Sequence, residues 1–285
     1  MKYYLGLNSE TNFDSPIFDK FDGVGMIRGE NLCINKTNYF PNDEFCEFVT
    51  DYLCLVAKHF KNKPVTYRTA DLTSKQINLL DNCDEFINNE KDVLVGNRGI
   101  RRNITHLPAY YKELNAFIKA YKKCPNLQIL IPFVSTVEEF LIAKKILKDL
   151  EYNGKIGIMI ETAAVLLLLD DFEKAGCDFY VVGVNDLTGS LLYSNRETKV
   201  YSINNPAVHR AIEFVSGKLH SYNKPVVVAG YLNKDFEIFC KDKIDYLNVH
   251  YNEIPEIFDV EDDQFFIKPY KEMRAEYEIR KKRAK

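Results

Sequence analysis

Several features that define other classes of protein are missing from this 285-residue sequence. The seven cysteines are scattered and include no Cys-x-x-Cys pair, which argues against a disulfide framework or a zinc site. The formal net charge is only −3, so no overall field attracts nucleic acid or an anionic membrane surface. The longest fully apolar run, 163–169, is too short to span a bilayer.

The sequence also lacks a signal peptide and a dinucleotide-binding motif. The first residues, MKYYLGLNSETNFDSP, lack the apolar core and the small-residue cleavage site of a signal peptide. Together with the scattered cysteines, this predicts a soluble protein in the reducing cytoplasm. No GxGxxG follows the first predicted strand, so a dinucleotide-binding Rossmann fold loses its main support.

The chain does contain short apolar, β-branched runs that alternate with helical patterns. Several runs are continuous, as in parallel strands that helices cover on the outside, so the pattern indicates an α/β fold. We predict strands at 23–28, 64–70, 92–96, 127–134, 155–161, 179–185, 224–230 and 245–250. Between them we predict helices at 43–60, 107–123, 136–150, 163–175 and 206–221.

The number of predicted strands decides between α/β architectures. Eight strands in a chain of this length fit a single (β/α)8 TIM barrel better than a doubly wound sheet. The sequence shows no internal repeat, low-complexity linker or break in composition, so we expect one domain over 1–285. The charged segment at about 262–283 is predicted to form an outer C-terminal helix.

Acids and arginines gather where the predicted strands end, and a TIM barrel carries its active site at that rim. Two carboxylates from adjacent strand ends provide the oxygen ligands that Mg2+ prefers. The planar arginine fork binds a carboxylate or a phosphate through two parallel hydrogen bonds. The pattern therefore predicts a metal-assisted anion site. Its members are Arg28, Arg68, Asp71, Arg98, Glu161, Asn185, Asp186 and Arg196, with Glu30, Asn97 and Arg101 beside them.

Each of these residues also has an ordinary structural interpretation. Glu161 and Asp186 taken alone fit capping or salt-bridged acids equally well. Any one arginine fits a solvated surface position better than a binding site. It is the convergence of opposite charges from several strand ends that favours a site.

The stretches around these residues resemble the barrel of the phosphoenolpyruvate (PEP)-utilising enzymes, which include PEP synthase, pyruvate phosphate dikinase and enzyme I of the sugar phosphotransferase system. They follow the family's order over nearly the whole chain, and the NDLT and IPFVSTVEE blocks are specific. The matching stretches are DGVGMIRGENL (22–32), YRTAD (67–71), GNRGIRR (96–102), ILIPFVSTVEE (129–139), IMIETAAVLL (158–167), VGVNDLTGSLLYSNR (182–196) and NNPAVHRAIE (204–213).

The resemblance implies a role for each matching residue. Glu161 and Asp186 resemble the family's two Mg2+ ligands, and Mn2+ is the alternative cation. Asn185 resembles the amide that contacts the phosphoryl group of the substrate. The arginines that clamp PEP or pyruvate correspond to Arg28, Arg68, Arg98 and Arg196, and Asp71 lies with them in the predicted substrate site.

The end of the seventh predicted strand departs from the family. The family has Cys-Gly-Glu or Cys-Gly-Gln there, and the cysteine protonates C3 of the enolpyruvate. This sequence reads VVVAGYLNKD and has Ala229 at that position. In an extended chain Tyr231 shares the strand face of Ala229, so it is a candidate proton donor or a residue that reshapes the pocket.

Three functions fit these residues. The first is a kinase-like, PEP-dependent phosphotransferase, and we expect its phosphohistidine and nucleotide-binding domains to act in trans because neither is recognised in this sequence. The alternative is a Mg2+-dependent lyase or aldolase that works through a pyruvate enolate, which the loss of the cysteine favours. The third is a non-catalytic subunit that binds PEP or pyruvate. The resemblance also implies a homodimer, for which the sequence shows no interface.

Overall fold

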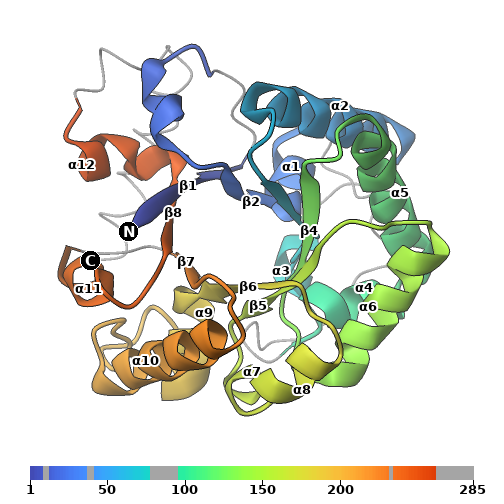
Figure 1. Cartoon of the computed structure of the whole chain (residues 1–285). Helices are drawn as coiled ribbons and strands as arrows, with labels where there is room; N and C mark the ends of the chain where they lie inside the picture. The colour runs from blue at the N-terminus through green and yellow to red at the C-terminus, as the bar shows by residue number, and fades with distance from the viewer. Residues whose placement is uncertain (9–12, 37–41, 78–95, 231–233, 261–285) are drawn as a thin grey trace.

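The chain folds into a closed barrel of eight parallel strands that pair in chain order, with β1 closing against β8 (Figure 1). The computed structural model describes residues 1–8, 13–36, 42–77, 96–230 and 234–260. The expected (β/α)8 architecture is therefore confirmed. The strands are β1 (Lys2–Leu7), β2 (Val24–Arg28), β3 (Val65–Arg68), β4 (Leu127–Ile131), β5 (Ile156–Ile160), β6 (Phe179–Gly183), β7 (Val227–Ala229) and β8 (Tyr246–His250).

Helices surround the barrel on its outside (Figure 1). None of those in the described part of the chain combines the length and the apolar character needed to cross a membrane. They are η1 (Pro16–Lys20), α1 (Gly29–Lys36), α2 (Asp43–Phe60), α3 (Ser74–Ile77), α4 (Gly99–Thr105), α5 (Leu107–Lys123), α6 (Val137–Asp149), α7 (Ala163–Leu167), α8 (Leu169–Lys174), α9 (Val184–Leu192), α10 (Pro206–Ser221), α11 (Lys234–Cys240), η3 (Tyr251–Glu253) and α12 (Ile254–Phe258).

Side-chain caps begin the long outer helices. The Asn42 side chain accepts a hydrogen bond of 2.7 Å from the Phe45 backbone and starts α2. Thr136 and Glu139 form a reciprocal capping box at the start of α6, only a few residues after β4 ends. Such caps satisfy the first free N–H groups of each helix, so strand and helix can follow one another through short loops.

Two hydrophobic clusters hold the barrel together. The larger one lies between the strands and the helices and contains fully buried residues such as Phe117 of α5 and Val49 of α2. The smaller one fills the barrel interior, because alternate residues on each strand point inward. It consists of Met26, Leu130, Met159, Val181, Val227 and Ala229.

The predicted strand series needs one correction. The first barrel strand is β1 at Lys2–Leu7, which the sequence patterns did not reveal, and none of the eight strands comes from 92–96. Of that stretch, only Gly96 lies in the described part of the chain. The runs expected to be the first and second strands are therefore β2 and β3, whereas the later strands keep their expected places.

The predicted helices are confirmed more closely than the strands. Helices 43–60, 107–123 and 206–221 have the expected bounds, and 136–150 differs by one residue at each end. The segment 163–175 was wrong as one helix, because it divides at Leu168 into α7 and α8. The charged segment 262–283 lies outside the described residues.

Candidate functional site

A cavity of about 370 Å3 opens where the barrel strands end. Its wall combines the carboxyl ends of β2, β3, β5, β6 and β7 with the loops that follow them. This is the rim that carries the active site in TIM-barrel enzymes. All of its charged lining residues were noted in the sequence: Arg28, Glu30, Arg68, Asp71, Arg98, Glu161, Asp186 and Arg196.

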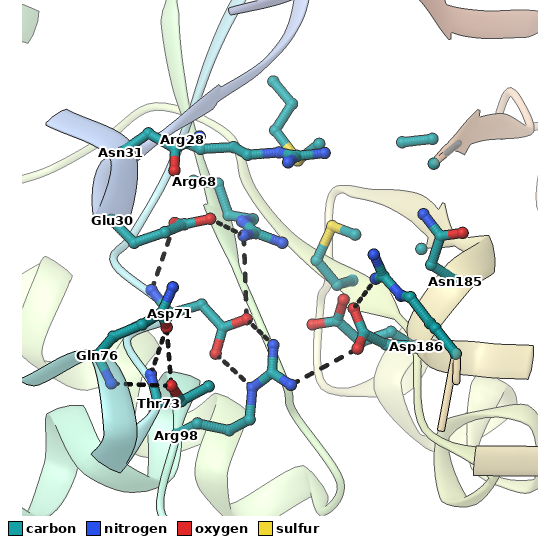
Figure 2. Close-up of a pocket in the computed structure, with 17 residues that line it drawn as sticks. Arg28, Glu30, Asn31, Arg68, Asp71, Thr73, Gln76, Arg98, Asn185 and Asp186 are labelled. Atoms are coloured by element: carbon teal, nitrogen blue, oxygen red, sulfur yellow. Dashed lines mark hydrogen bonds and ion pairs between the residues drawn. The ribbon is translucent and has the colours of Figure 1, made fainter. Parts of the chain in front are cut away.

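Two of the arginines are held by carboxylates at the back of the cavity. Arg68 pairs with Glu30, and its Nη2 lies 3.9 Å from Asp71 Oδ2. Arg98 binds Asp71 with both prongs of its fork, with Nε 2.9 Å from Oδ1 and Nη2 2.5 Å from Oδ2. Burial alone would lower the pKa of both guanidinium groups, but these carboxylates outweigh it and raise the pKa. Both arginines are therefore charged, and ion pairs with these carboxylates hold them in place (Figure 2).

Arg98 lies at the rim as predicted, but a different structural element carries it there. It does not end a strand but occupies the N-cap position of α4 without a side-chain cap, and Gly99 next to it has a φ of +55°, a conformation that favours glycine. A Cβ at Gly99 would lie 2.5 Å from the Cβ of Phe133, so the loop packs closely on the segment after β4. The guanidinium then lies over the Phe133 ring, 4.1 Å from its centre, as in a cation–π contact.

Arg28 differs from its neighbours because it makes no ion pair within the described part of the chain. Its Nε is buried without a hydrogen-bond partner there. Burial, and then the charge of Arg68, lower the pKa of Arg28. Arg28 as a whole is half-buried. A partly desolvated cation without an ion-pair partner is costly, so this arginine is suited to receive an anion from the cavity.

Glu161 follows β5 directly and is only 1% exposed. Its Oε1 accepts a hydrogen bond of 2.5 Å from the Phe133 backbone, whereas its Oε2 has no partner in the described structure. Burial, only partly offset by Arg68, raises the pKa of this carboxyl. Phe133 has a φ of +59°, a strained conformation for an aromatic residue, and its N–H is the donor to Glu161.

Asn185 and Asp186 lie in the first turn of α9, which continues directly from β6. Asp186 is 3.5 Å from Arg98 and 3.8 Å from Arg196, between their nearest nitrogen and oxygen atoms (Figure 2). The Arg196 side chain is 61% exposed at the mouth of the cavity. The structure thus brings together from six segments all the residues predicted for the site except Tyr231, which lies outside the described residues.

A carboxylate pair and one unsatisfied oxygen fit a hard divalent cation. Mg2+ accepts one or two carboxylates and takes its other ligands from water and substrate. Glu161 and Asp186 both line the cavity, and Glu161 has a free oxygen. Within the described residues, no group of three or more His, Cys, Asp or Glu side chains forms a complete metal cage. The residues therefore fit an Mg2+ that shares its coordination sphere with a ligand.

The sequence analysis did not predict several residues that line the cavity. Met26 and Met159 form an apolar floor with Ala229, and they precede Arg28 and Glu161 by two positions on the same strand face. The period of a strand could have located them. Three more neutral polar residues of the wall were missed and follow no such periodicity: Asn31, Thr73 and Gln76. Arg101, noted at the rim, instead pairs with Glu139 and Ser135, and Asn97 does not line the cavity.

A buried acid supports the loop after β3. Glu113 of α5 is completely buried, and its Oε1 accepts hydrogen bonds from Tyr67 Oη at 2.8 Å and from the Ala70 backbone at 2.7 Å. Burial raises the pKa of Glu113 to about 7, although both hydrogen bonds lower it. The segment between Arg68 and Asp71 is thus tied to an outer helix.

Comparison with known proteins identifies the family. A "Probable phosphoenolpyruvate synthase" of Pyrococcus horikoshii is 29% identical over 75% of this chain and 28% of its own length. A "Phosphoenolpyruvate-dependent phosphotransferase system" protein of Salmonella typhimurium is 25% identical over 82% of this chain and 32% of its own length. The chain thus spans about a third or less of these relatives.

One solved structure supports the fold alone. A Haloferax volcanii malate synthase, solved as a magnesium/glyoxylate complex, has a TM-score of 0.54 with 11% identity and covers 89% of this chain and 73% of its own. The model of the family described as "PEP-utilising enzyme, PEP-binding domain" matches residues 5–259. This chain belongs to that family of PEP-binding domains.

Proposed function

We propose that this barrel binds PEP, pyruvate or a related enolpyruvate acid together with Mg2+ and takes part in phosphoryl transfer. One observation carries the proposal: four arginines and four carboxylates line a single cavity at the strand ends of a PEP-binding-domain barrel. Such a site binds a small acid that carries both a carboxylate and a phosphate.

The arginines divide into two pairs with different roles. Arg68 and Arg98 are fixed by Glu30 and Asp71, so their remaining N–H groups are preorganised for a ligand. Arg28 makes no ion pair in the described structure, and Arg196 has only the 3.8 Å contact with Asp186 there, so these two would supply the charge that an incoming anion neutralises. Fixed positive groups of this kind stabilise charge that develops on a transferring phosphoryl group and on an enolate.

The charges of the cavity explain why a cation would be needed. The four arginines and the four carboxylates cancel formally, so the cavity alone offers little net attraction to a multiply charged anion. Glu161 and Asp186 would hold Mg2+, or Mn2+, which has similar oxygen ligands. When bound, the cation polarises the ligand oxygens and adds the missing positive charge. Cation and acid should then strengthen each other's binding.

Phosphoryl transfer needs an acceptor that these residues do not provide. We propose that a phosphohistidine domain and a nucleotide-binding domain complete the reaction, since the relatives are much longer than the part that this chain matches. The expected homodimer and the cytoplasmic location stay predictions.

The floor of the cavity favours a second candidate, a Mg2+-dependent lyase or aldolase that works through a pyruvate enolate. Met26, Met159 and Ala229 form this floor, and none of the three carries an acidic proton. An enolate that lies against this floor would receive no proton from these residues. Its C3 could therefore attack the carbonyl carbon of a second substrate instead. A third candidate, binding without turnover, uses the same residues.

Calorimetric titration at saturating Mg2+ tests the proposal. PEP should bind to the wild type, and Arg98→Lys should weaken it about tenfold or more, because lysine keeps the charge but loses the two-pronged contact. Arg101→Lys is the matched control, because Arg101 pairs with Glu139 outside the cavity. Equal PEP binding by both variants would refute the site.

The same preparation separates the candidates. PEP binding favours phosphotransfer, and pyruvate binding alone favours the lyase. Exchange of the pyruvate methyl protons in D2O, followed by proton NMR, would indicate enolate formation. Binding with neither exchange nor transfer would leave the non-catalytic subunit.

A further inference from the structure

The orientation of one amide decides what Asn185 can offer to a ligand. Asn185 lines the cavity beside Asp186 and Gly230. Its side chain carries an acceptor oxygen and a donor NH2 group, and the two ends occupy nearly the same space when the amide is flipped. A phosphoryl oxygen only accepts hydrogen bonds, so just one of the two orientations helps to bind it.

Tyr201 selects this orientation from behind the cavity. Its single hydroxyl proton is shared between two acceptors in a three-centre hydrogen bond, the backbone oxygen of Asn185 at 3.0 Å and Oδ1 at 3.3 Å. With Oδ1 held by the tyrosine, Nδ2 is on the opposite side. In Figure 2 the nitrogen of the Asn185 amide points toward the other lining residues and its oxygen points away from them.

A glycine leaves room for the NH2 group. Gly230 lines the cavity with a φ of +149°, and a Cβ built there would lie 3.0 Å from Asn185 Nδ2. A side chain at this position would crowd the amide nitrogen. The donor end of Asn185 therefore faces a space that the backbone after β7 keeps open.

Tyr201 is itself held in place. It packs against the large hydrophobic cluster, and its backbone N–H donates to Thr198 O at 3.2 Å. Burial raises the pKa of its hydroxyl, so the group stays a donor at neutral pH. The same residue anchors the segment that carries Arg196 to the first turn of α9.

We infer that Tyr201 is a positioning residue that fixes the Asn185 amide as a donor to the phosphoryl group of the ligand. The inference rests on the proposed function and adds a reason for selectivity: Tyr201 matters for a ligand with a phosphoryl group and much less for one without it.

Titration of Tyr201→Phe with PEP and with oxalate at saturating Mg2+ tests the inference. PEP binding should weaken about fivefold to tenfold, the effect of one lost hydrogen bond to the ligand, whereas oxalate binding should change less than twofold. Tyr222→Phe is the matched control, because its hydroxyl binds Asp170 at another part of the molecule. Thermal melting of both variants reports on folding.

A double-mutant cycle separates positioning from packing. In an Asn185→Ala background, Tyr201→Phe should have no further effect on PEP binding, because the amide it positions is gone. Additive losses, an unchanged PEP affinity in Tyr201→Phe, or equal losses for PEP and oxalate would overturn the inference. If the wild type binds oxalate but not PEP, the inference fails while a lyase site survives. If it binds neither ligand, the proposed function fails first.

Discussion

Replacing Glu113 by glutamine should change how the stability of this protein depends on pH. Glu113 is completely buried behind the loop that carries Arg68 and Asp71, and burial raises the pKa of its carboxyl from 4.5 to about 7. A raised pKa in an acid means that the folded state prefers the protonated form. This stabilisation is fully present below pH 4.5 and is lost as the pH rises through 7.

The size of the effect follows from the pKa. A tenfold change in proton affinity corresponds to about 1.4 kcal/mol, so moving the pKa from 4.5 to about 7 is worth on the order of 3 kcal/mol. Between pH 5 and pH 8 we expect the wild type to lose roughly 2–3 kcal/mol through this group. The raised pKa arises from burial of the carboxyl group, and Oε2 has no hydrogen-bond partner in the described structure that would stabilise the ionised form.

Glutamine imitates the protonated acid and cannot ionise. It keeps an oxygen to accept from Tyr67 and from the Ala70 backbone, the two donors that Glu113 has now. Urea unfolding at pH 5 and pH 8 gives the free energy of unfolding for both proteins. From pH 5 to pH 8, the free energy of unfolding of Glu113→Gln minus that of the wild type should rise by roughly 2–3 kcal/mol, because only the wild type loses this stabilisation. Glu138→Gln, at an exposed position of α6, is the control. A constant difference between Glu113→Gln and wild type would refute the reasoning.

Three further substitutions test the floor and the cation side of the cavity. Glu161→Gln should abolish Mg2+-dependent oxalate binding while circular dichroism shows an intact fold, and unchanged binding would exclude this residue as a ligand. Gly183→Ala should weaken the same binding about tenfold, because a Cβ would lie 2.8 Å from Glu161 Oε2, whereas Gly217→Ala, with nothing within 4 Å, should not. Ala229→Cys should speed the conversion to pyruvate of enolpyruvate that an added phosphatase releases from PEP, measured with lactate dehydrogenase; no gain over wild type would mean that more than the acid is missing.

The sequence could predict the barrel and the acids of the rim for one physical reason. Strands that helices cover on the outside are continuous apolar runs, so the first charged residue after a run marks the strand end. Glu161 follows β5 in this way, and Asn185 and Asp186 follow β6 within the first turn of α9. Because all parallel strands end at one rim, placing these residues together needed no tertiary information.

The remaining features depend on contacts that no local pattern encodes. β1 was missed because its first three residues are not buried and its apolar half is short and contains Gly6. Arg98 lies at the rim because the Ile100 backbone N–H donates to Pro132 O, which ties α4 to the segment after β4. The hydrogen bonds that the Ala70 N–H donates to Glu113 and that the Tyr201 hydroxyl donates to Asn185 each join segments that are distant in the chain.

Titration of the purified protein with oxalate, with and without Mg2+, tests the central claim most directly. Oxalate has the shape and charge of an enolpyruvate and chelates a divalent cation as that enolate would. Because the charges that line the cavity cancel, we predict that oxalate binds tightly only when Mg2+ is present. Mg2+ should likewise bind only weakly when oxalate is absent. Oxalate binding of equal strength without Mg2+ would contradict the assignment of Glu161 and Asp186, and no binding in either condition would contradict the enolpyruvate site itself.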